Sequence, residues 1–188
     1  MAPLDLATAT VAELLRDRAT EMPDSPFFRC ERDWISYLEL DQRSKRLAAS
    51  LAALGVERGD RVAILATNRD AHAELLFAAA KGAMIHVPLN PYLKEDGLMH
   101  QLQVTTPRAV IADEDGYAML ERLWPRLSGF VAHVVAWNLA HPPRNDSARS
   151  VTANCSRRMA HPAAGPAKAI RWRSSSRPGH RVPRRAAC

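Results

Sequence analysis

The polar side chains that follow one apolar segment are the first candidates for chemistry in this 188-residue chain. Asn68, Arg69 and Asp70 come directly after RVAILA (61–66), a continuous apolar run that is typical of a strand buried on both faces. Open α/β sheets tend to bind ligands at the carboxyl ends of their strands, which makes this triplet a candidate for ligand contact. The structural alternative is that Asn68 and Asp70 cap the helix that follows.

Histidines and cysteines could in principle bind a metal, but their spacing argues against it. His72, His86, His100 and His133 have no Asp, Glu or His partners at metal-ligand spacing, and His86 lies within the apolar segment IHVPL (85–89). We therefore expect core or rim histidines and no metal site.

Cys30, Cys155 and Cys188 are far apart, odd in number and form no CxxC pair, so neither a disulfide framework nor a zinc site is expected. A reducing, cytoplasmic location fits this cysteine usage. The N-terminus lacks signal-peptide features, and no apolar stretch approaches the roughly 18–20 residues of a membrane helix.

Hydrophobic periodicity predicts regular elements from residue 10 to residue 137. A helix over 10–23, capped by Thr10 and Glu13, precedes a hairpin of 27–32 and 34–37 that turns at Arg32-Asp33. A long helix over 37–54 then ends at Gly55. Strands over 61–66, 85–89, 108–113 and 130–137 alternate with helices over 71–82, 96–105 and 117–127. This alternation predicts an α/β fold with a parallel sheet flanked by helices.

The composition changes after about residue 140, so we divide the chain into a body, 1–140, and a tail, 141–188. The body carries 15 Lys+Arg and 19 Asp+Glu, a net charge of −4, whereas the tail carries 11 and 1, a net of +10. The tail is rich in Arg, Pro and Ser and has few large apolar residues, which predicts disorder unless a partner orders it. Its arginines favour nonspecific, salt-sensitive binding of polyanions and no specific nucleic acid.

Several motifs of the body occur in order in one enzyme family. They are TVAELLRDRATEMPDSP (10–26), SYLEL (36–40), LGVERGDRVAI (54–64) and KGAMIHVPLNP (81–91). The body resembles the N-terminal portion of the acyl-adenylate-forming, AMP-dependent synthetase/ligase family, with acyl-CoA or carnitine-type CoA ligases the most similar. On the residues alone, Pro88 and Pro91 indicate a structural corner between a strand and a helix.

The resemblance implies an ATP-dependent ligase. Such enzymes convert a carboxylic acid and ATP to an acyl adenylate, release pyrophosphate and pass the acyl group to a thiol, usually that of coenzyme A. It implies ATP, magnesium and coenzyme A as cofactors of the intact family, and a carboxylic acid as substrate.

The family holds ATP phosphates with a T-S-G-T-T-G-x-x-K loop. The nearest match is AHPAAGPAK (160–168), where Gly165 and Lys168 agree with the pattern and are the candidate cofactor-binding residues. No catalytic or metal-binding residue can be transferred from the family, and its C-terminal lid has no counterpart in this sequence.

Two interpretations follow. One is a truncated ligase, inactive alone, whose tail arises from a frameshift near residues 138–145. The alternative is a non-catalytic binding or scaffold protein that keeps a ligase-like subdomain.

Overall fold

The computed structural model describes residues 10–30, 33–67, 70–137 and 151–153. Helix α1 (Val11–Glu21) comes first, and a hairpin of β1 (Pro26–Cys30) and β2 (Asp33–Ser36) leads into helix α2 (Tyr37–Ala53). Strands and helices then alternate as β3 (Arg61–Leu65), α3 (Asp70–Gly82), β4 (Ile85–Pro88), α4 (Glu95–Thr105), β5 (Ala109–Ala112), α5 (Glu114–Leu127), β6 (His133–Trp137) and β7 (Val151–Ala153). The predicted α/β fold is confirmed.

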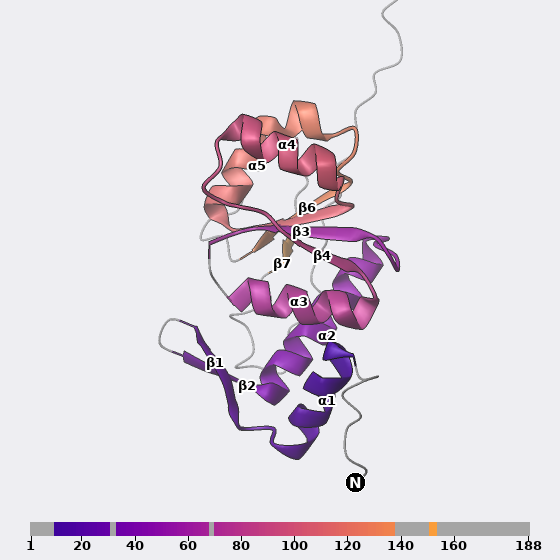
Figure 1. The fold of residues 1–188 in the computed structure, drawn as a ribbon, viewed down its shortest axis with the longest axis vertical. Coiled ribbons are helices and arrows are strands. Elements are labelled where there is room, and N and C mark those ends of the chain that lie inside the picture. The colour runs from indigo at the N-terminus through magenta and orange to yellow at the C-terminus, as the bar shows by residue number, and fades with distance from the viewer. Residues whose placement is uncertain (1–9, 31–32, 68–69, 138–150, 154–188) are drawn as a thin grey trace, which may run out of the picture.

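The central sheet is parallel and has the strand order β4-β3-β5-β6-β7. Helices α2 and α3 lie on one side of it, and α4 and α5 lie on the other (Figure 1). All four residues of β5 are buried, because β5 is covered by helices on both faces and paired on both edges.

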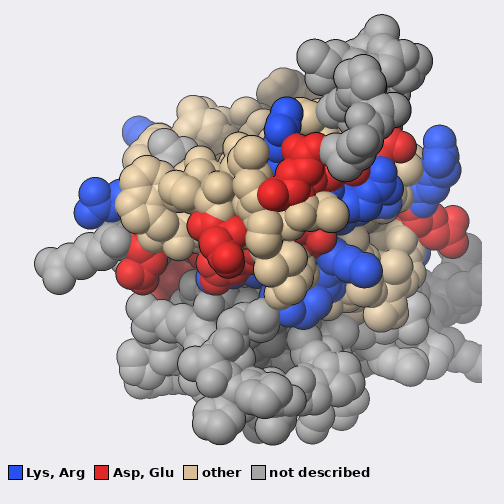
Figure 2. Space-filling view, turned by 90° about the horizontal axis from the view of Figure 1, so that it is seen from below, with Lys and Arg blue, Asp and Glu red and all other residues tan. Residues whose placement is uncertain are grey.

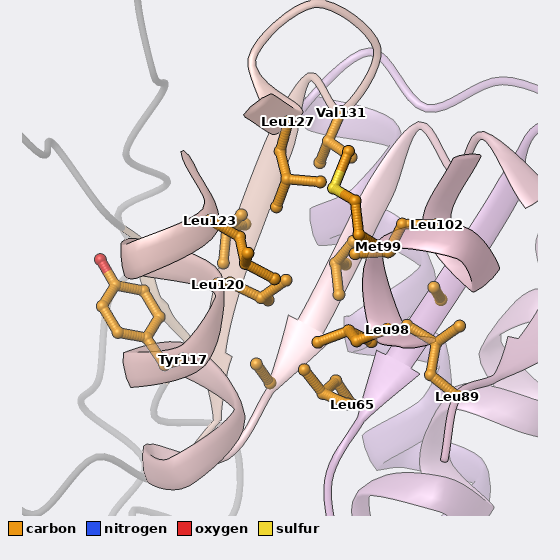
Figure 3. Close-up of a cluster of buried hydrophobic side chains, with 14 of the residues drawn as sticks. Leu65, Leu89, Leu98, Met99, Leu102, Tyr117, Leu120, Leu123, Leu127 and Val131 are labelled. Atoms are coloured by element: carbon orange, nitrogen blue, oxygen red, sulfur yellow. The ribbon is translucent and has the colours of Figure 1, made fainter. Parts of the chain in front are cut away.

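Each face of the sheet has its own apolar cluster. On one face, Leu98, Met99 and Leu102 of α4 pack with Leu120 and Leu123 of α5 over the strands (Figure 3). The opposite face is filled by α2 and α3 side chains, including Leu47, Leu51, Leu75 and Ala78. Burial of this apolar surface is the main favourable term in folding.

A third, smaller cluster joins the hairpin and α1 to the outer side of α2 and α3. It comprises Leu15, Ile35, Leu40 and Phe77. Figure 2 looks onto this end of the molecule from below and shows acidic and basic side chains interspersed among uncharged residues. No large surface of a single charge sign is visible there, in line with the balanced charge of the body.

The caps proposed for α1 and α2 are confirmed. Thr10 and Glu13 form a reciprocal capping box, in which the Glu13 amide donates to Thr10 Oγ1 at 3.2 Å and the Thr10 amide donates to Glu13 Oε2 at 2.8 Å. These hydrogen bonds hold the pKa of Glu13 below its ordinary value. Gly55 follows α2 with φ of +80°, a conformation that glycine adopts without strain.

Some details of the sequence prediction were wrong. Asp33 belongs to β2 instead of the hairpin turn. The large apolar side chains of Leu38, Val104 and Trp34, which lie within predicted elements, are exposed by 37%, 70% and 59%. The structure also places a short parallel strand, β7, within the tail, where the sequence predicted no order.

Helix α5 begins three residues before the predicted position, and Gly116 explains why it can. A Cβ atom at Gly116 would overlap the carbonyl oxygen of Leu65, so only glycine lets the first turn of α5 approach the end of β3 this closely. Among the described residues, no helix is long and apolar enough to cross a membrane.

We predict that Gly116→Ala lowers the free energy of unfolding by about 2 kcal/mol, because the new methyl group must displace the β3 backbone. Chemical denaturation followed by circular dichroism measures the effect. Gly129→Ala is the matched control, since a Cβ atom there meets nothing within 4 Å. Equal stability of the two variants would contradict the close contact between α5 and β3.

Candidate functional site

The carboxyl edge of the parallel sheet brings together the segments that follow β3, β4 and β5. In open α/β sheets ligands bind outside this edge, which makes it the candidate functional site. The described polar side chains at this edge are Thr67 after β3, Asn90 after β4 and Asp113 after β5. Asp70 and His72, at the beginning of α3, lie just beyond β3.

Asp113 ties the ends of two neighbouring strands together. Its Oδ1 accepts a hydrogen bond from the Gly116 amide at 3.0 Å and so caps α5. Its Oδ2 accepts from the Thr67 amide at 3.0 Å and from the Thr67 hydroxyl at 3.2 Å. The carboxylate is only 8% exposed, so it holds the start of the segment after β3 against the end of β5.

The Asn68, Arg69 and Asp70 triplet is only partly described. Asn68 and Arg69 lie outside the described residues. Asp70 is the first residue of α3 instead of its cap, and its Oδ1 accepts from the Ala71 amide at 3.1 Å. Its Oδ2 lies 3.6 Å from Nη1 of Arg43 on α2. Asp70 therefore contributes to the contact between α3 and α2 in this structure.

Arg43 is the centre of a buried ionic cluster, which we call the Arg43 cluster and which comprises Arg43, Glu39, Asp70 and Glu74. The guanidinium donates to Glu39 on its own helix and, at 3.2 Å, to Oε1 of Glu74 on α3. Burial alone would lower the pKa of Arg43, but its hydrogen bonds and carboxylate neighbours raise it overall.

Glu74 is the most unusual titratable group in the described part of the chain. Its side chain is 0% exposed. Burial raises the pKa of the carboxyl from 4.5 to about 7, although the charge and hydrogen bond of Arg43 oppose that shift. The Arg43 cluster lies between α2 and α3, and it is therefore separate from the candidate site at the carboxyl ends of the strands.

The four histidines differ in their exposure: His133 is buried, His72 and His86 are half-buried, and His100 is exposed. His72 Nε2 lies 3.1 Å from the Ala66 carbonyl oxygen. Burial lowers the pKa of the half-buried His86, and nearby His72 lowers it further. The described part of the chain contains no group of three or more His, Cys, Asp or Glu side chains that could hold a metal ion.

The corner after β4 is held by local hydrogen bonds. The side-chain oxygen of Asn90 accepts from the Tyr92 amide at 2.9 Å, and the Asn90 amide donates to Gln101 of α4 at 3.2 Å. These contacts explain the corner between Pro88 and Pro91 without any ligand.

Gly165 and Lys168, the candidates for phosphate contact, lie outside the described residues. The polar side chains at the described sheet edge are engaged in hydrogen bonds within the protein. The described part of the chain therefore provides a framework at the sheet edge. The hydrogen bonds between Thr67 and Asp113 are the feature of this edge that the sequence analysis did not predict. An aspartate directly after a buried strand, with glycine three residues later, is the signal that could have indicated it.

Comparison with known proteins identifies the family. The family model described as AMP-binding enzyme matches residues 15–166, most of the chain. The chain belongs to the AMP-binding enzyme family. The match extends beyond residue 140, where the sequence pattern places the start of the tail, and it includes Gly165 but not Lys168.

Two of the similar curated proteins are named as fatty-acid ligases. The chain is 32% identical over 127 residues to a long-chain-fatty-acid–CoA ligase of Salmonella typhimurium, which covers 67% of this chain and 22% of that protein. It is 30% identical over 114 residues to the fatty acid–[acyl-carrier-protein] ligase ScoC of Streptomyces coeruleorubidus, which covers 61% of this chain and 22% of the relative.

A solved structure shows the same likeness. A protein of Rhodopseudomonas palustris, assigned as a long-chain-fatty-acid CoA ligase, superimposes with a TM-score of 0.67 at 31% identity, covering 72% of this chain and 34% of the other. The chain thus spans about a fifth to a third of the length of these AMP-binding family members.

We predict that Asp113→Ala lowers the free energy of unfolding by about 2 kcal/mol, because α5 loses its cap and Thr67 loses its carboxylate acceptor. Hydrogen exchange should quicken most at the Thr67 amide. Glu121→Ala, which changes an exposed carboxylate on the same helix, is the control and should change neither quantity. An unchanged Thr67 amide in Asp113→Ala would contradict the role of this link.

Proposed function

We propose that the chain is the N-terminal part of an ATP-dependent acyl ligase that activates a carboxylic acid as its adenylate and then transfers the acyl group to a thiol. The observation that carries this proposal is the family match over residues 15–166. The names of the two relatives favour a fatty acid as substrate, and they leave coenzyme A or an acyl-carrier protein as the thiol.

The reaction places its main demands on a phosphate site. In the first step a carboxylate oxygen attacks the α-phosphorus of ATP, and pyrophosphate leaves. In the second step a thiol sulfur attacks the acyl carbon, and AMP leaves. Triphosphate binding calls for backbone amide donors, hydroxyl groups and a cation close together.

Within this proposal the described residues act as scaffold. The Thr67–Asp113 link sets where the segment after β3 begins, and the hydrogen bonds of Asn90 set the corner after β4. Gly165 and Lys168 are the candidates for phosphate contact in this chain, but Ala163 and Ala164 occupy positions where the family loop has threonine hydroxyls. The described part contains no group of three or more His, Cys, Asp or Glu side chains that could hold a metal ion, and we assign none of its residues to magnesium.

We therefore expect the 188-residue chain to form no acyl adenylate by itself, because its loop lacks hydroxyl groups. We further propose that a frameshift near residues 138–145 separates the body from the family loop in the coding DNA. Translation of the other two reading frames beyond this point should then reveal a T-S-G-T-T-G-like segment.

We predict that a protein joining residues 1–137 to that restored frame releases pyrophosphate when supplied with ATP, magnesium and a fatty acid. The 188-residue chain should release at least about 100-fold less, since a lost set of preorganised phosphate contacts costs several kcal/mol of transition-state stabilisation. A coupled pyrophosphate assay with a panel of carboxylic acids measures both proteins.

The joined protein with its loop lysine replaced by alanine serves as the control for phosphate binding. Pyrophosphate release by the 188-residue chain at the rate of the joined protein would overturn the expected inactivity. If neither frame encodes the loop, the frameshift is excluded and the scaffold interpretation takes its place. Pull-downs with and without residues 141–188 then test that interpretation.

A further inference from the structure

The Arg43 cluster places more negative than positive charge in a space that solvent barely reaches. Arg43 is 8% exposed and Glu74 is 0% exposed. The guanidinium contacts Glu39, Glu74 and Asp70, three carboxylates from two helices. If all three were ionised, one buried arginine would face three negative charges.

A second cation does not balance this excess. Arg46, one turn further along α2, lies close enough to interact with Glu74 by charge. Among the described residues, two arginines then stand against three carboxylates, so this set of side chains reaches neutrality when one carboxyl group holds a proton. Bringing unbalanced charge out of water is costly, so neutrality is favoured.

Other charged groups on the elements around α3 have their own partners. Lys81 pairs with Asp41 at 2.7 Å, about two turns along α3 from Glu74. On α1, the exposed pairs Arg16–Asp17 and Arg18–Glu21 are internal to that helix.

Charged and titratable groups on the sheet side of α3 also interact elsewhere. His86 of β4 interacts with His72, and Arg61 of β3 donates to the Thr105 carbonyl oxygen. None of these groups supplies the missing positive charge to Glu74.

Glu74 is the carboxyl group best placed to hold the proton. Its Oε1 accepts from Arg43, whereas its Oε2 is buried and makes no hydrogen bond with the described residues. Protonation at Oε2 therefore removes the charge of a buried carboxylate of which only one oxygen has a hydrogen-bond donor among the described residues. By contrast, Glu39 and Asp70 reach solvent, with side chains 33% and 14% exposed.

We propose that Glu74 holds a proton at mildly acidic pH and that its loss near neutral pH loosens the first turn of α3, so that the Arg43 cluster acts as a pH-sensitive joint between α2 and α3. Ionised Glu74 faces Asp70 four residues earlier on the same helix, a spacing at which like charges repel. The first turn, which carries Asp70, should move before the rest of α3, because Asp70 is nearer to solvent and lies at the end of the helix. The following turns are held by Leu75 and Ala78, which pack in the apolar cluster.

The direction of the pH effect follows from the folded and unfolded states. Burial raises the pKa of Glu74 from 4.5 to about 7, so the folded protein keeps a proton that the unfolded chain loses. The contribution of Glu74 to stability is therefore complete below about pH 4.5 and is lost as the pH rises through about 7.

The first test measures Glu74 directly in the full 188-residue chain. Carbon-13 NMR of glutamate-labelled protein, with Glu74→Gln used to assign the signal, should show a carboxyl group that titrates near pH 7. A Glu74 signal that titrates below pH 5 would overturn the proposal, and this result does not depend on the stability of any variant.

The second test measures the joint itself. The amides of residues 74–77 donate to the carbonyl groups of the first turn of α3. Between pH 6 and pH 8, hydrogen exchange at these amides, corrected for its intrinsic pH dependence, should quicken roughly tenfold, the change that one pKa unit of linkage provides. Glu74→Gln, which mimics the protonated form, should abolish this change. Glu95→Gln, which alters an exposed ion pair with Arg122, is the matched control and should keep it.

Asp70→Asn tests the charge repulsion separately. Because the charge of Asp70 raises the pKa of Glu74, its removal should shift the exchange transition to lower pH. A transition that stays in place in Asp70→Asn, or one that persists in Glu74→Gln, would contradict the proposed joint.

Discussion

Coverage of both faces of a short parallel sheet is the constraint on which this structure depends. Parallel strands need crossover connections, and each crossover from β3 to β6 is a helix that returns over one face. Strands β3 and β5, which pair on both edges, are apolar except for Arg61, because every other position on them is buried. The peripheral parts, α1 and the hairpin, pack only on the outer side of α2 and α3 and add a third apolar cluster.

Two polar links inside this arrangement join elements that are distant in sequence. Asp113 connects the ends of β3 and β5 through Thr67, and Arg43 connects α2 to α3 through Glu74 and Asp70. The first link is well satisfied and orders the edge of the sheet at which related folds bind ligands. The second concentrates charge between two helices, so its state depends on protons. The ordered sheet edge of the proposed ligase thus depends on the Thr67–Asp113 link, whereas the proposed sensitivity to pH depends on the Arg43 cluster between α2 and α3.

Membership of the AMP-binding family agrees with this division between framework and chemistry. The described residues supply a parallel sheet, its flanking helices and an ordered edge, whereas the candidates for nucleotide contact, Gly165 and Lys168, lie outside them. Asn90 and the two prolines beside it show how a motif shared with an enzyme family can be explained by local hydrogen bonds alone. The position of Asn90 in this motif is explained by the turn between β4 and α4.

The sequence by itself determined the order and type of nearly all the described elements, because apolar periodicity, the Thr10 capping box and Gly55 are local signals that act within a few residues. It also determined the family, through motifs spread over the body. The tertiary structure alone decided that Leu38 and Val104 face solvent, that β7 pairs beside β6, and that Asp70 turns toward Arg43. These features, like the raised pKa of Glu74, arise from contacts between residues far apart in the chain, and a local pattern carries no record of such contacts.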